Sequence, residues 1–111
     1  MNDKELLELA AKAASMEIDW YGDKALTVQM FRGHLKNWLD WNPLEDDGDA
    51  LRLAVKLRIS LQFDFDRIDA VAKDGEILET EYIYKNPKTD EYATSRRAIV
   101  RAAAEIGKDL K

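Results

Sequence analysis

Apolar residues recur at steps of three and four in three parts of the chain, and this spacing predicts a helix in each of them. The helices are expected over residues 3–14, 48–57 and 92–108. An acidic side chain near the start of a helix can accept hydrogen bonds from free backbone amides and interacts favourably with the helix dipole. The segment at 48–57 carries the widest apolar arc, so we expect it to be the most buried helix.

Alternating apolar and polar residues predict strands between the helices. Residues 16–21 and 25–31 are expected to pair across a short turn. Residues 68–72 and 77–84 are expected to form a second antiparallel pair. The dipeptide Asp74-Gly75 joins this second pair and suits the positive φ angles of a tight hairpin turn. The sequence therefore predicts two hairpins.

The clearest alternation lies at residues 59–65 and predicts a strand whose apolar side faces the core. The expected core residues of this strand are Ile59, Leu61, Phe63 and Phe65. By contrast, residues 33–47 follow neither the helical nor the strand period. We interpret that segment as an irregular connection whose tryptophans fold back on the core.

Together these elements predict a single α+β domain with the order α-β-β-α-β-β-β-α. A chain of 111 residues has the length of one domain, and no internal repeat or linker divides residues 1–111. One mainly antiparallel sheet covered by helices is the expected architecture. The wide apolar arc at 48–57 favours helices on both faces of this sheet, in a layered α/β/α sandwich, and leaves a two-layer fold as the alternative.

Composition and charge exclude several classes of protein. No apolar run approaches the 18 residues that span a bilayer, and the first residues lack the pattern of a signal peptide, so we expect a cytoplasmic protein without a membrane segment. The chain has no cysteine and one histidine, which removes thiolate chemistry and any site that needs two histidines. A net charge of -5 disfavours direct binding to nucleic acid.

Two further features could carry chemistry but have simpler explanations. The acidic run at residues 45–49 lacks the alternate spacing of a calcium-binding EF-hand and precedes a helix, so we interpret it as a helix cap. His34 has no cysteine, second histidine or activated serine to work with, which makes it a weak catalytic candidate. We therefore expect no metal, no cofactor and no enzymatic activity.

A candidate ligand-binding set combines cations with aromatic rings. Arginine side chains can bind a phosphate, and tryptophan rings can stack on a base. The candidate residues are Trp38, Trp41, Arg96, Arg97 and Arg101. The simpler interpretation places the arginines on a solvent-exposed helix face, paired with nearby acids, and the tryptophans in the core.

Three segments of the chain, taken together, resemble a known family. They are residues 1–14, 41–57 and 96–107, and their most specific part is Trp41-Asn42-Pro43-Leu44 running into Asp46-Asp47-Gly48-Asp49-Ala50-Leu51. In this order and spacing they are similar to the small phage- and prophage-encoded proteins of the phage ABA sandwich domain family. The resemblance implies a layered α/β sandwich and a phage or prophage origin, and it brings no activity and no catalytic residues.

These observations lead to two functional hypotheses. The first is a non-catalytic accessory protein of a phage or prophage that binds a host protein in the bacterial cytoplasm. The acidic surface would suit a basic target, because complementary charge speeds encounter. The second hypothesis is a module that binds or sequesters a small, nucleotide-like ligand through the arginines and tryptophans named above.

Overall fold

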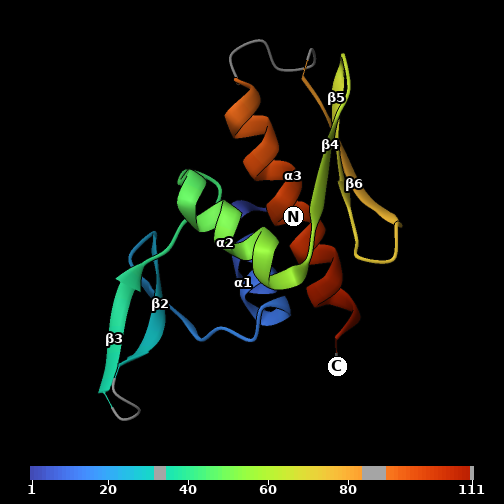
Figure 1. Ribbon diagram of the computed structural model, residues 1–111. Coiled ribbons are helices and arrows are strands. Elements are labelled where there is room, and N and C mark those ends of the chain that lie inside the picture. The colour runs from blue at the N-terminus through green and yellow to red at the C-terminus, as the bar shows by residue number, and fades with distance from the viewer. Residues whose placement is uncertain (32–34, 84–89, 111) are drawn as a thin grey trace.

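The computed structural model describes residues 1–31, 35–83 and 90–110, and it has the predicted α+β composition (Figure 1). In chain order the elements are α1 (Asp3–Ala13), β1 (Ile18–Tyr21), β2 (Lys24–Phe31), β3 (Leu35–Asp40), α2 (Asp47–Leu57), β4 (Ser60–Phe63), β5 (Arg67–Val71), β6 (Ile77–Tyr82) and α3 (Glu91–Asp109). The predicted elements occur in the predicted order, with β3 as an addition. The predicted end of the second hairpin, at residue 84, lies outside the described residues.

Side-chain caps fix where the three helices begin. At the start of α2, the carboxylate of Asp46 accepts a hydrogen bond from the amide of Asp49 at 2.7 Å. Asn2 caps α1 and Asp90 caps α3 in the same way. The interpretation of the acidic run as a helix cap is therefore confirmed. The three helices also match their predicted ranges to within one residue at each end.

The strands form two three-stranded sheets instead of the single sheet that was expected. Sheet A has the order β1-β2-β3, and sheet B has the order β4-β5-β6. The interpretation of residues 33–47 as irregular is wrong for residues 35–40, where β3 pairs with β2 along its length, and right for residues 41–46, which form neither helix nor strand. Val28 lies opposite Trp38 and Thr27 opposite Leu39. The neighbouring apolar residues Trp38 and Leu39 point to opposite faces, which hides the alternation in the sequence.

Helix α3 lies at the centre of the molecule (Figure 1). Sheet B packs against it through β5 and β6, while α1 and α2 pack against its other side. α1 and α3 approach each other closely at Gly107, where a Cβ atom would lie 2.1 Å from the carbonyl oxygen of Leu9. Sheet A extends beyond α1 and α2, away from sheet B. The helices therefore form a layer between two sheets instead of covering both faces of one.

Helix α2 is not the most buried helix, which corrects the expectation from its wide apolar arc. Its buried residues are Ala50, Leu53 and Ala54, whereas α3 has eight buried residues. Leu51 is 63% exposed and Val55 is 55% exposed on the outer side of α2. Because α3 covers only one side of this helix, part of the apolar arc faces solvent.

The prediction that the apolar side of 59–65 is buried fails at its two phenylalanines. Phe63 lies opposite the fully buried Ile68, on the side of sheet B that faces α3. Ile59 is buried and Leu61 is half-buried, but Phe63 is 68% exposed and Phe65, in the turn after β4, is 99% exposed. The reason is that α3 packs on β5 and β6 and leaves the edge strand β4 with little cover.

Candidate functional site

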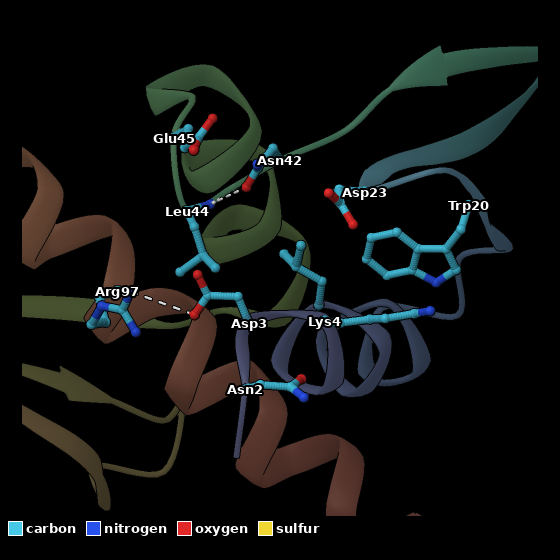
Figure 2. Close-up of a pocket in the computed structure, with 10 residues that line it drawn as sticks. Asn2, Asp3, Lys4, Trp20, Asp23, Asn42, Leu44, Glu45 and Arg97 are labelled. Atoms are coloured by element: carbon cyan, nitrogen blue, oxygen red, sulfur yellow. Dashed lines mark hydrogen bonds and ion pairs between the residues drawn. The ribbon is translucent and has the colours of Figure 1, made fainter.

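Four segments that are far apart in the sequence meet at a groove beside the start of α1 (Figure 2). The charged residues that line it are Asp3 and Lys4 from α1, Asp23 from the β1–β2 turn, Glu45 from the β3–α2 connection and Arg97 from α3. The groove has a volume of about 690 Å³. This size suits a small molecule or a side chain of another protein.

The connection between β3 and α2, which forms one wall of the groove, is fixed by hydrogen bonds. The side chain of Asn42 accepts from the Leu44 amide at 3.1 Å, and the Asn42 amide donates to Asp49 at 3.0 Å. Arg96 donates from Nε to the carbonyl oxygen of Leu44 at 2.9 Å. Pro43, between them, is fully buried. These contacts give the Trp-Asn-Pro-Leu segment a structural role.

The charges that line the groove are mixed. Lys4 Nζ lies 5.1 Å from the centre of the Trp20 ring, within the range of a cation–π interaction. Arg97 forms an ion pair of 3.6 Å with Asp3, and the two side chains point toward one another (Figure 2). Three carboxylates and two cations line the groove, a balance that suits a cationic or neutral polar group better than a phosphate. No group of three acidic or histidine side chains in the described ranges is placed to hold a metal ion.

The three candidate arginines on α3 reach three different neighbours. Arg96 forms an ion pair of 2.5 Å with Asp47 at the start of α2. Arg97 lines the groove, and Arg101 lies 3.1 Å from Glu81 on β6. Their expected position on a solvated helix face holds in part: the side chains of Arg97 and Arg101 are each 41% exposed, whereas that of Arg96 is 17% exposed, and α3 also lies against other elements. Their ion-pair partners accordingly come from those elements and not from α3 itself.

The two candidate tryptophans also lie in separate environments. Trp41 is only 5% exposed and belongs to the core, and its amide donates to the Ala25 carbonyl oxygen at 3.0 Å. Trp38 is 42% exposed on β3. The structure therefore does not bring the five candidate residues together, and a ligand contact by any one of them stays a prediction. His34 lies outside the described residues.

The outer face of sheet A carries a row of apolar side chains turned away from the helices. Trp38 lies directly opposite Val28, and Leu26 lies two residues along β2 on the same face. An ion pair of 3.0 Å between Lys24 and Asp40 lies at the end of this row. Leu26, Val28 and Trp38 are named the apolar row below.

Sequence reasoning singled out Trp38 but missed its two neighbours. Ala25 and Thr27 on β2 are buried against the helices, whereas Leu26 and Val28 are half-buried on the opposite face. In β2 the apolar Leu26 and Val28 alternate with Thr27, and the buried side of the strand is the one that carries Ala25 and Thr27. The larger apolar side chains of this alternation therefore lie on the outer face, and the sequence alone does not show which face of a strand is turned to the core.

A second charged cluster is enclosed between α3 and sheet B. Arg101 Nη1 lies 3.1 Å from Glu81 and 3.8 Å from Glu79. Both glutamates are on the face of β6 that is turned toward α3. Burial raises the pKa of Glu79, the charge of Arg101 opposes this shift, and the charge of Glu81 adds to it. This cluster is an internal contact of the fold and not an open binding site.

Comparisons with known proteins do not place the chain in a family. No protein-family model matches it, and neither a curated protein nor a solved structure matches it. No helix in the described part of the chain has both the length and the apolar character needed to cross a bilayer. The groove and the apolar row are therefore the two candidate binding surfaces in the described part of the chain.

Proposed function

We propose that this chain is a non-catalytic accessory protein of a phage or prophage that binds a host protein. The apolar row on the outer face of sheet A is the observation that carries the proposal. Its side chains face away from the core, and an exposed apolar row of this kind is typical of a protein interaction surface. The phage origin, the host partner and the bacterial cytoplasm as its location are drawn from the family resemblance.

Trp38 is the expected anchor of the interface. Tryptophan is enriched among the residues that dominate binding energy, because its large ring loses much water-exposed area when it is buried. Val28 lies directly opposite Trp38 on the same face of sheet A. The ion pair between Lys24 and Asp40 provides a polar rim. The net charge of -5 favours a partner with a basic surface around its apolar cleft.

The proposal predicts that Trp38→Ala removes partner binding without unfolding the protein. The tagged wild type, Trp38→Ala and Tyr92→Ala are used as baits in a lysate of the host bacterium. Tyr92 is a matched control because it is 70% exposed, aromatic and located on α3. We expect Trp38→Ala to reduce capture of the partner at least about tenfold, while Tyr92→Ala retains it.

Circular dichroism of the three baits should be the same, which separates a binding defect from unfolding. Two results would contradict the proposal. One is a wild type that captures no specific protein even at low salt. The other is a partner that Trp38→Ala and Tyr92→Ala capture equally well.

The groove beside α1 favours the alternative function, the binding of a small ligand. Trp20 offers an aromatic ring there, and Lys4 and Arg97 offer positive charge. The three carboxylates of the groove oppose a phosphate, so this function ranks second. Native mass spectrometry distinguishes the two functions, since a co-purified nucleotide would favour the alternative. A protein that carries no ligand and shows no thermal shift with a panel of nucleotides would exclude it.

A further inference from the structure

The edge of β4 and the residues around it form a surface that the chain leaves uncovered. β4 is the edge strand of sheet B and pairs with β5 on one side. Phe63 at its end and Phe65 in the next turn are the exposed phenylalanines described above. At the other end of β4, the exposed Leu51 and Val55 of α2 line a shallow depression together with Arg58.

We propose that two copies of the chain pair through their β4 strands, antiparallel and about a two-fold axis. Pairing of the two edges joins the two copies of sheet B into one six-stranded sheet. The open edge of a strand carries backbone N–H and C=O groups without partners, and a second strand can satisfy them. The exposed apolar residues at both ends of β4 add burial to these hydrogen bonds.

Two-fold symmetry decides which side chains meet. The axis that relates two adjacent antiparallel strands is perpendicular to the sheet, so facing residues come from the same face of each copy. With Gln62 opposite Gln62 of the second copy, Leu61 faces Phe63 of the second copy inside the paired strands, and Phe65, in the turn after β4, comes to the end of the pair where Ile59 lies. The apolar positions of residues 59–65 therefore meet one another across the axis. The sequence pattern predicts that Phe63 and Phe65 are buried, and the second copy buries them where a single chain does not.

The same register brings opposite charges together. Arg58 is the C-cap of α2 just before β4, and antiparallel pairing brings this end of one β4 to the turn of the second copy that carries Asp64 and Asp66. Among the described residues of one chain, Asp64 and Asp66 both pair with Arg67, at 3.1 and 3.7 Å, so two carboxylates face one described cation at this turn. Arg58 and Lys73 line the depression and form no ion pair with the described residues. The basic end of one β4 thus meets the acidic end of the other, twice in the dimer.

The end of α2 excludes the register that is shifted by two residues toward the helix. A shift of two residues would place Phe65 of the second copy opposite Leu57, the last residue of α2, where the backbone is helical. With the Gln62 pair at the centre, Phe65 comes to the end of the pair where Ile59 lies, after the helix. Its ring then lies beside the depression lined by Leu51 and Val55.

Light scattering coupled to size-exclusion chromatography tests the proposal by measuring the mass in solution. We expect the wild type to reach twice its chain mass of 12.7 kDa as its concentration rises. Phe63→Lys places a charge in the apolar contact and should raise the dissociation constant at least about tenfold. Tyr92→Lys changes an equally exposed aromatic residue on α3 and should leave the dimer intact.

A charge swap tests the register. Arg58→Asp and Asp66→Arg should each weaken the dimer about tenfold, because each places like charges opposite one another. The double variant should restore the dimer, which a folding defect would not allow. Three results would overturn the proposal: a wild type of 12.7 kDa at every concentration, a dimer that Phe63→Lys leaves intact, or a double variant that remains a monomer. These variants leave the apolar row unchanged, so partner binding through Trp38 is tested separately.

Discussion

Sheets A and B are both three-stranded antiparallel meanders, but their middle strands have different surroundings. In sheet B, residues 68–71 of β5 are all buried, so both faces of the strand are covered. In sheet A, β2 buries Ala25 and Thr27 but leaves Leu26 and Val28 half exposed. Helix α3 accounts for much of the difference, because it packs closely on sheet B. Stability is therefore concentrated around α3, while the outer face of sheet A is turned toward solvent.

The largest expected difference in the free energy of unfolding is between substitutions of Ile68 in sheet B and of Val28 in sheet A. Ile68 is fully buried, so Ile68→Ala should lower the free energy of unfolding by about 2–5 kcal/mol through lost burial and a cavity. Val28→Ala removes a half-buried side chain from a solvent-facing row and should cost about 1 kcal/mol or less. Urea denaturation followed by circular dichroism measures both losses. Equal losses would contradict the concentration of stability around α3.

Local signals in the sequence were sufficient to predict the helices. Each helix has its apolar spacing and its capping side chain within a few consecutive residues, as at Asp46 and Asp90. Their ranges were therefore predicted closely. The division of the strands into two sheets depends on which strands pair, and pairing is a non-local property that periodicity does not contain. β3 was missed for a related reason, since Trp38 and Leu39 are adjacent and face opposite sides.

The candidate site was predicted less well than the fold. Arg96, Arg97 and Arg101 form a cationic stripe in the sequence, but their partners come from α1, α2 and β6. Nothing local in the sequence indicates these partners, because they depend on how α3 packs at the centre of the molecule. Trp38 was a candidate ligand contact from the sequence, and the structure places it on an exposed face of β3, where its contact with a ligand stays a prediction.

The contact between α1 and α3 tests whether packing among the helices contributes to the free energy of unfolding, as packing on sheet B does. Gly107→Ala places a Cβ atom against the backbone of Leu9, and backbone atoms cannot rotate aside. We expect a loss of about 1–3 kcal/mol in the free energy of unfolding, despite the better helix propensity of alanine. The effect should be a lower urea midpoint with an unchanged slope.

Gly48→Ala is the matched control for this substitution. Gly48 is also a helical glycine, but its added Cβ would meet only side-chain atoms of Arg52 and Asp46 at 3.2 Å or more. These side chains can move, so Gly48→Ala should be neutral or stabilising by up to about 1 kcal/mol. A similar loss at both glycines would contradict the close packing of α1 on α3.

The smallest expected effect is on the pH dependence of stability. It involves Glu79, which lies between sheet B and α3. Because its pKa is raised in the folded protein, the native state holds this proton to a higher pH than the unfolded chain does. The stability contributed by the bound proton is present below the unfolded pKa and is lost as the pH rises through the folded pKa. Glu79→Gln removes this titration, and Arg101 keeps Glu81 as a partner at 3.1 Å.

We therefore expect the stability of Glu79→Gln relative to the wild type to increase as the pH rises from the ordinary glutamate value of 4.5 toward neutrality. Urea unfolding of both proteins at several pH values measures this difference. Well below pH 4.5 the side chain is neutral in both proteins. Any difference in their unfolding free energies there comes from replacing the carboxyl group with an amide, and it serves as an internal control. A difference that stays constant or falls with rising pH would show that Glu79 is not desolvated by α3. Sheet B would then be as open to water on its inner face as sheet A is on its outer face.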